Sequence, residues 1–138
     1  MNISTYNTLT DDAKEIRKLV FMEEQGFQDE YDEIDTISTH FVLFDKELPV
    51  ATCRVFFDKE KNAYTLGRLA VIQKYRGNNI GSILVKETEK YVIAKGGTEI
   101  VLHAQCRASG FYTKLGFTKF GNIENEEGCP HIWMRKSL

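Results

Sequence analysis

The segment from His40 to Ile72 constrains the fold of this chain more than any other. It alternates β-branched, aromatic and leucine residues, and turn-forming residues interrupt it at Asp45–Glu47 and Asp58–Asn62. Alternating runs separated by short polar breaks are typical of antiparallel strands joined by hairpins. The pattern therefore predicts three such strands. Their predicted bounds are about residues 40–45, 49–57 and 63–71.

The residues after this segment indicate a helix and then a fourth strand. The helix begins near Ile80 and stops at Gly96–Gly97. Its predicted inner face consists of Ile83, Leu84, Thr88 and Tyr91. The run "EIVLHA" predicts a strand at about 99–104. Because a helix connects them, this strand and strand 63–71 should be parallel, as in a βαβ unit.

The two ends of the chain complete the predicted architecture. Thr10 is a predicted N-cap, and a helix at about 11–25 ends at Gly26, before an acidic loop with one helical turn. The run "QCRASGFYTKLGF" predicts a helix closed by Gly116, and strands "FTKFG" and "HIWMRK" surround the loop "NIENEEGCP". We therefore predict an α/β or α+β fold. It has a central mixed, mostly antiparallel sheet of about six to seven strands, flanked by about four helices.

Composition narrows the class of protein. The 138 residues are 42% hydrophobic, which suits a single folded domain over 1–138. The net charge of −2 argues against a nucleic-acid partner, and no apolar run reaches the roughly 20 residues that cross a membrane. The start of the chain lacks the pattern of a secretory signal, and its three cysteines form no CxxC pair. We therefore expect a cytoplasmic protein.

The run "RGNNIGS" from Arg76 to Ser82 stands at the start of the helix predicted from Ile80. Its Gly and Asn residues can turn several backbone N–H groups toward one point, and the helix adds N–H groups without intrahelical partners. Such a place suits a phosphate. The spacing matches neither the GxGxxG nor the GxxxxGK[ST] nucleotide motif, and a turn that only starts a helix is the alternative interpretation.

Together, "LGRLAVIQKYRGNNIGSILV" and the later "FYTKLGF" resemble the Gcn5-related N-acetyltransferase (GNAT) family, and the resemblance covers nearly the whole chain. The family's loop pattern, (Gln/Arg)-x-x-Gly-x-(Gly/Ala), matches Arg76 and Gly81, while Asn79 stands in place of the first glycine. The segments "EEQGF", "DEYDEID" and "EEGCPHIWMRK" look like a small bacterial branch of this family, whose members mostly lack an assigned acceptor.

The resemblance implies direct transfer of an acetyl group from acetyl-CoA to a primary amine in a ternary complex. It implies that the backbone of Leu69, Ala70 and Val71 holds the pantetheine arm. It assigns the pyrophosphate to Arg76, Gly77, Asn78, Asn79, Ile80, Gly81 and Ser82. Tyr112 would protonate the leaving thiolate, and an aromatic residue packed in the core is the alternative interpretation. The acceptor would be a small-molecule or peptide amine, and the family often forms a homodimer.

The region that borders the acceptor in related enzymes offers candidates for the general base. These are Glu33, Asp35 and His40, because a carboxylate there could take a proton from an ammonium group through water. Four further residues are candidates for binding the acceptor: Glu24, Arg54, His103 and His131. Five of the seven residues 29–35 are acidic and would attract a cation. Such runs are usually solvated, and we favour that interpretation.

Other functions fit the sequence less well. Cys106 or Cys129 with a histidine base would suit a thiol hydrolase, but no nucleophile turn surrounds either cysteine. Zinc binding lacks paired ligands, so we expect no metal. A non-catalytic module that senses acyl-CoA or binds a partner is the stronger alternative, although it would have less need of Tyr112.

Overall fold

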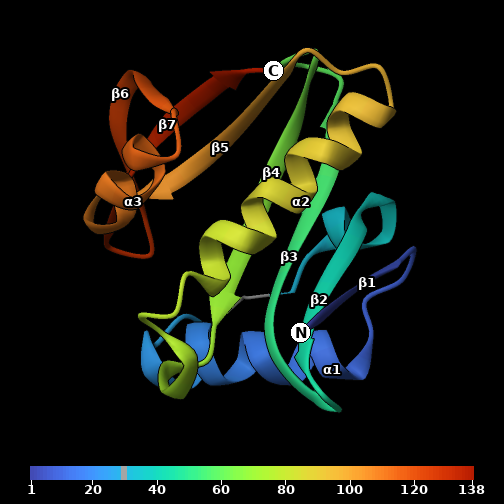
Figure 1. The fold of residues 1–138 in the computed structure, drawn as a ribbon. Helices are drawn as coiled ribbons and strands as arrows, with labels where there is room; N and C mark the ends of the chain where they lie inside the picture. Colours follow the sequence, from blue (N-terminus) through green and yellow to red (C-terminus); the bar gives the residue numbers. More distant parts are fainter. Residues whose placement is uncertain (29–30) are drawn as a thin grey trace.

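The computed structural model describes residues 1–28 and 31–138. Within these residues, seven strands form one sheet in the order β1-β2-β3-β4-β5-β7-β6 (Figure 1). The strands are β1 (Asn2–Tyr6), β2 (Thr39–Asp45), β3 (Leu48–Asp58), β4 (Ala63–Val71), β5 (Glu99–Gln105), β6 (Thr118–Glu126) and β7 (Cys129–Ser137). Neighbouring strands are antiparallel except β4 and β5, which are parallel. The predicted mixed, mostly antiparallel sheet is confirmed.

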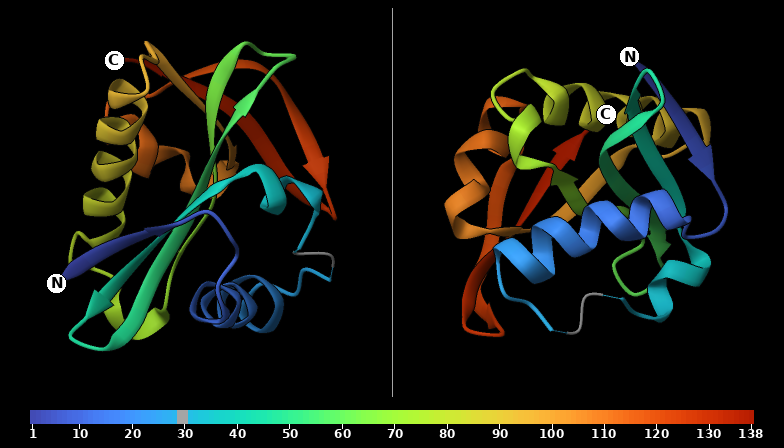
Figure 2. Two further views of the ribbon diagram at one scale, coloured as in Figure 1. Left: turned by 90° about the vertical axis from the view of Figure 1, so that its right-hand side faces the viewer. Right: turned by 90° about the horizontal axis from the view of Figure 1, so that it is seen from below.

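Helices cover both faces of this sheet (Figure 2). The α-helices are α1 (Asp11–Arg17), α2 (Ile80–Ala94) and α3 (Ser109–Lys114), and α1 continues into the π-helical segment η1 (Lys18–Glu24). Short 3-10 turns form η2 (Glu33–Ile37), η3 (Gln73–Tyr75) and η4 (Cys106–Ala108). α1 lies on one face of the sheet and α2 on the other. Among the described residues, no helix combines the length and the hydropathy needed to cross a membrane.

The hairpins that join β2, β3 and β4, and the parallel unit of β4, α2 and β5, agree with the prediction. The sequence pattern gives no sign of β1, which is a short edge strand. The predicted loop over 122–130 is wrong, because β6 extends to Glu126 and only Glu127 and Gly128 turn the chain, with φ of 50° and 78°. β6 is an edge strand with almost all its side chains exposed, so it lacks the hydrophobic alternation by which strands are recognised.

α1 begins where the sequence predicts. The side chain of Thr10 accepts a hydrogen bond from the backbone N–H of Ala13 at 3.2 Å, which satisfies one of the unpaired donors of the first turn. Ala13, Ile16 and Val20 are buried in one cluster with Val42 of β2. This cluster fixes the end of η1 beside β4.

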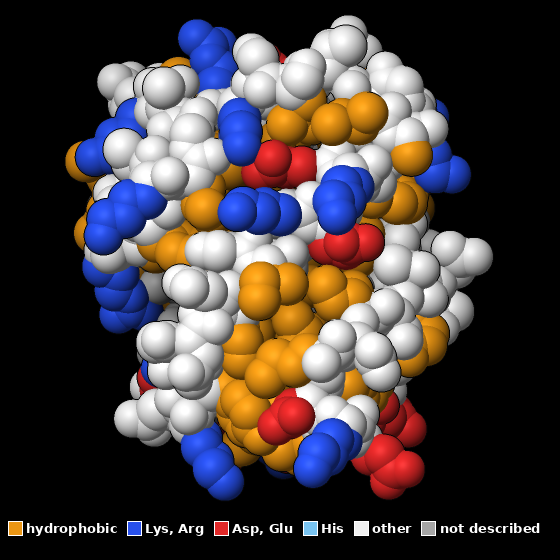
Figure 3. Space-filling view, viewed as in Figure 1, with side chains coloured by type: hydrophobic (Ala, Val, Ile, Leu, Met, Phe, Trp, Pro, Cys, Tyr) orange, Lys and Arg blue, Asp and Glu red, His pale blue; other side chains and the backbone are white. Residues whose placement is uncertain are grey.

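The buried face of α2 differs in part from the prediction. The buried residues are Ile80, Leu84, Val85, Thr88 and Val92. Ile83 is 45% exposed, because the buried stripe follows the i, i+4 row that starts at Ile80 and leaves Ile83 beside it. Hydrophobic side chains also gather at the surface on the lower half of the face that α2 crosses (Figure 3).

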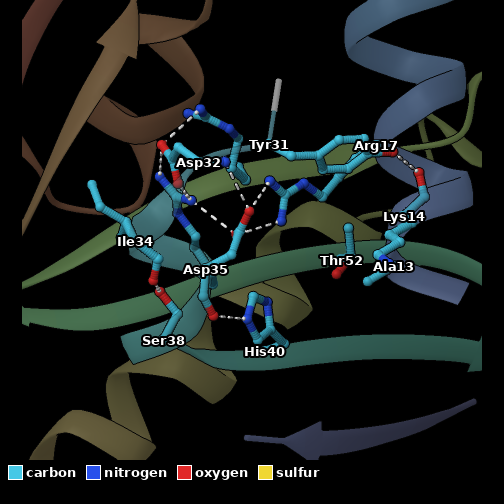
Figure 4. A network of polar contacts seen from close by, with 12 residues as sticks. Ala13, Lys14, Arg17, Tyr31, Asp32, Ile34, Asp35, Ser38, His40 and Thr52 are labelled. Carbon is cyan, nitrogen blue, oxygen red and sulfur yellow. Dashed lines mark hydrogen bonds and ion pairs between the residues drawn. The ribbon is translucent and has the colours of Figure 1, made fainter. Parts of the chain in front are cut away.

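A buried network of charged side chains holds η2 against the sheet (Figure 4). Arg17 of α1 donates to both carboxylate oxygens of Asp35, at 2.8 and 3.1 Å. Arg54 of β3 donates to Asp35 at 2.9 Å and to Asp32 at 2.5 and 3.1 Å. The side chains of Arg17 and Arg54 are almost fully buried. Arg68 of β4 adds a contact of 3.3 Å to Asp32.

This network corrects the interpretation of the acidic run as solvated charge. Asp29 and Glu30 lie outside the described residues, but Asp32 and Asp35 bind arginines that are distant in the sequence. Burial alone would raise the pKa of Asp35, but hydrogen bonds and charge from Arg17 and Arg54 outweigh it and lower the pKa to about 2. A depressed pKa means that the ionised carboxylate stabilises the folded state.

We expect Asp35→Asn to lower the free energy of unfolding at pH 7 by about 3–5 kcal/mol, because two buried guanidinium groups lose their shared carboxylate. Urea unfolding measures the change. Glu47→Gln removes an exposed carboxylate from the turn after β2 and should change the free energy of unfolding by less than about 0.5 kcal/mol.

The stability difference between wild type and Asp35→Asn should depend on pH. The folded pKa lies below the unfolded value, so the stability from Asp35 is present above about pH 4 and is lost as the pH falls toward 2. The difference between wild type and Asp35→Asn should therefore shrink by about 2 kcal/mol between pH 5 and pH 2. A difference that does not change with pH would contradict this role of Asp35.

Candidate active site

The strands β4 and β5 separate after a short parallel ladder. They pair only at Tyr64 with Ile100, Thr65 with Val101 and Leu66 with Leu102, and then they diverge (Figure 1). The separation coincides with a bulge in β4. Thr52 and Arg54 of β3 pair with Ala70 and Gly67, so one residue of β3 faces two of β4. One of these two, Arg68, has a φ of 52°. A bulge bends its strand, which turns β4 away from β5.

A cleft of about 380 Å³ occupies the opening between the two strands. Its walls come from β4, β5, the end of η1, α3 and the β6–β7 hairpin. The apolar lining residues include Phe21, Phe27, Leu66, Leu69, Leu102, Ala104 and Ala108. The polar lining residues include Gln25, Arg68, His103, Gln105, Glu126 and His131. Tyr112 also lines it. One cleft is therefore lined by apolar side chains, a tyrosine and several ionisable side chains.

Tyr112 belongs both to the cleft and to the core. Its ring makes edge contacts with Phe111 and Phe117, with centroids 5.0 and 5.8 Å apart, and it lies in the main hydrophobic cluster. Burial raises the pKa of Tyr112, and neighbouring Cys53 raises it further. The two interpretations of Tyr112, cleft residue and core residue, therefore describe the same position.

The loop before α2 has the backbone conformation that its sequence allows. Gly77 and Asn79 have φ of 84° and 60°, and Asn79 is the left-handed residue immediately before Ile80, the first residue of α2. A Cβ atom on Gly81 would lie 3.1 Å from the Phe111 ring, closer than ordinary van der Waals contact. The absence of a side chain at Gly81 therefore lets the start of α2 approach α3.

The side chain of Arg76 is bound to protein groups in this structure. Its two terminal nitrogens donate to the carboxylate of Glu24 at 2.5 and 2.6 Å, and its Nε donates to the carbonyl oxygen of Val71 at 3.0 Å. Arg76 and Glu24 are 39% and 36% exposed. The pair connects the end of η1 with the loop before α2. It brings together two residues that the sequence analysis assigned to different ligands.

Two histidines of the cleft, one on β5 and one on β7, contact glutamates of β6. Nδ1 of His103 lies 2.9 Å from Oε1 of Glu126, and Nε2 of His131 lies 3.7 Å from Oε2 of the same residue. Nε2 of His103 lies 3.3 Å from Oε1 of Glu124. Glu124 and Glu126 are absent from the predicted site, because their segment was interpreted as a loop. Their two-residue spacing opposite His131 is the signal that could have found them.

The other predicted site residues lie away from the cleft lining. Glu33 is exposed on η2. Asp35 and Arg54 belong to the buried network, and Arg54 lies behind Gly67 of β4. Nε2 of buried His40 lies 2.9 Å from the carbonyl oxygen of Asp35, and burial lowers the pKa of His40. This arrangement gives Asp35, His40 and Arg54 contacts that stabilise the fold.

The described residues contain no group of three or more His, Cys, Asp and Glu side chains that could hold a metal ion. Cys53, Cys106 and Cys129 are free thiols, and Cys53 is buried. Cys106 and Cys129 both line a second pocket, which shares Gln25 and Phe27 with the cleft.

Comparisons with known proteins agree with this geometry. The acetyltransferase (GNAT) domain family matches residues 7–138. A Bacillus subtilis protein whose name describes it as an acetyltransferase is 36% identical over 129 residues, which cover 90% of this chain and 86% of the relative. A crystal structure of a Lactobacillus plantarum protein named as an N-acetyltransferase superposes with a TM-score of 0.89 at 26% identity, over 99% of this chain and 97% of that one.

One structural neighbour was crystallised with a ligand. It is an aminoglycoside 6'-N-acetyltransferase in complex with coenzyme A, with a TM-score of 0.79 at 22% identity, over 99% of this chain and 97% of that one. At this identity the likeness shows a shared fold.

The burial of Tyr112 has a consequence that absorbance spectroscopy can check. Because its pKa is raised, Tyr112 should keep its proton through about pH 9 to 11, where ordinary tyrosines ionise. Wild type and Tyr112→Phe should therefore release the same number of phenolic protons in that range, with circular dichroism confirming that both stay folded. One additional ionisation in the wild type would contradict the buried position of Tyr112.

Proposed function

The chain belongs to the GNAT acetyltransferase family, and on that premise we propose that it transfers an acetyl group from acetyl-CoA to a primary amine, directly and within a ternary complex. The observation that carries this proposal is the cleft between β4 and β5 with Tyr112 on its wall. The neighbour crystallised with coenzyme A supports the choice of donor.

The donor would lie along the edge of β4 that β5 leaves unpaired. Its pantetheine arm can hydrogen-bond to backbone groups of Leu69, Ala70 and Val71, as a short strand would. The thioester would then reach the cleft beside Leu69 and Tyr112, which both line it. At the far end of β4, the loop from Arg76 to Ser82 and the start of α2 would receive the pyrophosphate.

Arg76 would contribute to donor binding by exchanging partners. The exposed ion pair between Arg76 and Glu24 is worth at most about 1 kcal/mol, because water screens it. A pyrophosphate carries more negative charge than the Glu24 carboxylate and also presents two oxygen acceptors to the guanidinium group. The remaining affinity would come from the backbone N–H groups around Gly77, Asn78 and Asn79 and from those at the start of α2.

The chemistry follows from these positions. The amine nitrogen attacks the acetyl carbon, a C–N bond forms, and the C–S bond breaks. The leaving thiolate needs a proton or a strong hydrogen bond, and the Tyr112 hydroxyl can donate it. Because burial raises the pKa of Tyr112, full transfer to a thiolate with a pKa of about 8.5 is uphill. Tyr112 therefore acts chiefly as a hydrogen-bond donor while charge develops on sulfur.

Donor binding can be tested by calorimetry with a variant at Gly81. Gly81→Val places a branched side chain against the Phe111 ring, where even a Cβ atom is tight, and pushes α2 away from α3. We expect acetyl-CoA to bind the wild type with micromolar affinity and to bind Gly81→Val at least about tenfold more weakly.

Lys86→Val is the matched control, because it places the same residue at an exposed position of the same helix and should leave acetyl-CoA affinity unchanged. Failure of the folded wild type to bind acetyl-CoA at sub-millimolar concentrations would exclude the proposed donor.

The role of Tyr112 can be tested by Tyr112→Phe, which keeps the ring and its packing but removes the hydroxyl. With any amine on which the wild type releases coenzyme A, kcat should fall by roughly 100-fold or more. The affinity for acetyl-CoA should stay within about twofold of the wild type, because the substituted hydroxyl serves the leaving group. Equal losses of kcat and affinity would mean that Tyr112 only supports the fold.

A further inference from the structure

The two histidines and Glu126 form a cluster at one end of the cleft. None of the three residues belongs to the proposed donor site. His103 and His131 have ring centroids 5.0 Å apart, and Glu126 contacts both imidazoles. His103 also stacks on Trp133 at 4.4 Å, which fixes its ring plane. The cluster is built from β5, β6 and β7, so three strands hold it in place.

Hydrogen-bond partners determine where this cluster can accept a proton. Nδ1 of His131 lies 2.8 Å from the carbonyl oxygen of Cys129, which only accepts, so Nδ1 carries the hydrogen. In the neutral ring, Nε2 then presents a lone pair toward Oε2 of Glu126 at 3.7 Å. These two acceptors are too far apart for a hydrogen bond with each other, and a donor such as an ammonium group can approach both.

His103 repeats the pattern. Its Nδ1 donates to Glu126, and its Nε2 is buried without a hydrogen bond and faces Oε1 of Glu124 at 3.3 Å. With neutral imidazoles, the two histidines and the two glutamates, Glu124 and Glu126, together carry two negative charges and two nitrogen lone pairs. The cluster therefore attracts a cation and can take up the proton that the cation releases.

Two other polar side chains of the cleft, Gln105 and Arg68, already have partners. Nε2 of Gln105 donates to Gln25 at 2.9 Å, and Oε1 of Gln105 accepts from Arg107 at 2.8 Å. Arg68 contacts Asp32. Of the two carboxylates that line the cleft, Glu126 and Glu127, Glu126 is the one in contact with the histidines. Its Oε2 lies 3.7 Å from Nε2 of His131, beyond hydrogen-bond distance, and is open to a further donor.

Most of the remaining cleft lining is apolar, and Gln25, Arg68, Gln105 and Glu127 are its polar members. Phe21 and Phe27 come from η1 and the residues after it, and Leu66, Leu102 and Ala104 come from the diverging strands. Such walls favour an apolar or aromatic body and penalise further charged or hydroxyl groups that would lose water without gaining a partner.

We propose that the acceptor is a monoamine with an apolar, preferably aromatic body and no carboxylate, and that the cluster of His103, His131 and Glu126 binds its ammonium group and accepts its proton. This rests on the proposed acetyl transfer. An ammonium group loses two protons when it becomes an amide. The cluster takes one and passes it to solvent, and the other ends on the leaving sulfur of coenzyme A, which the Tyr112 hydroxyl stabilises by a hydrogen bond.

Three amines test the acceptor class at saturating acetyl-CoA, with release of the coenzyme A thiol as the readout. 2-Phenylethylamine has the proposed features, phenylalanine adds a carboxylate to the same skeleton, and spermidine replaces the ring with further ammonium groups. We expect kcat/KM for 2-phenylethylamine to exceed the other two values at least tenfold. Equal or higher values for phenylalanine or spermidine would overturn the proposal.

Glu126→Gln tests the cluster itself. With 2-phenylethylamine, the variant should raise KM, because a charged contact is lost, and lower kcat at least tenfold, because the proton acceptor is lost. Glu60→Gln removes an exposed carboxylate from the turn before β4 and should change neither value. An unchanged kcat in Glu126→Gln would overturn the proton-accepting role.

Calorimetry with acetyl-CoA separates this proposal from the proposed function. If the wild type and Glu126→Gln bind acetyl-CoA equally and 2-phenylethylamine is not acetylated, the acceptor proposal fails while donor binding stands. If the wild type does not bind acetyl-CoA, the proposed function itself fails.

Discussion

The early end of the parallel ladder between β4 and β5 is the constraint on which the rest of this structure depends. After Leu66 and Leu102 the two strands no longer pair with each other. The outer edge of β4 stays paired with β3, and the outer edge of β5 stays paired with β7. A free strand edge inside a sheet would normally be filled by another strand. Here η1, α3 and the β6–β7 hairpin surround it, so the opening suits a narrow, extended molecule with amide groups of its own.

The bulge at Arg68 and the buried charges behind it belong to one arrangement. Arg54 lies next to Gly67 and contacts Asp32 and Asp35, and Asp32 also contacts Arg68. A bulge with a left-handed residue is strained, and it persists where its surroundings fix it. Burying Arg17 and Arg54 with Asp35 costs desolvation, so we interpret the network as an arrangement that fixes local geometry more than as a source of stability.

The sequence predicts the parts of this fold that repeat locally. Alternation over 40–71 gave β2, β3 and β4, and the loop before α2 was recognisable because Gly77, Asn79 and Gly81 stand at the turn. The buried network was not predictable, because Arg17 and Arg54 are far from Asp35 in the sequence. Glu124 and Glu126 were missed for a different reason. β6 is an exposed edge strand, and the register that brings Glu126 to His103 and His131 depends on a turn of two residues.

A crystal structure of the protein with coenzyme A is the most direct test of donor binding in the cleft. We expect the sulfur atom within hydrogen-bond distance of the Tyr112 hydroxyl, the pantetheine arm bonded to the backbone of β4 from Leu69 to Val71, and the pyrophosphate at the start of α2. Coenzyme A bound at saturating concentration on another face of the molecule, with the space between β4 and β5 empty, would contradict this assignment.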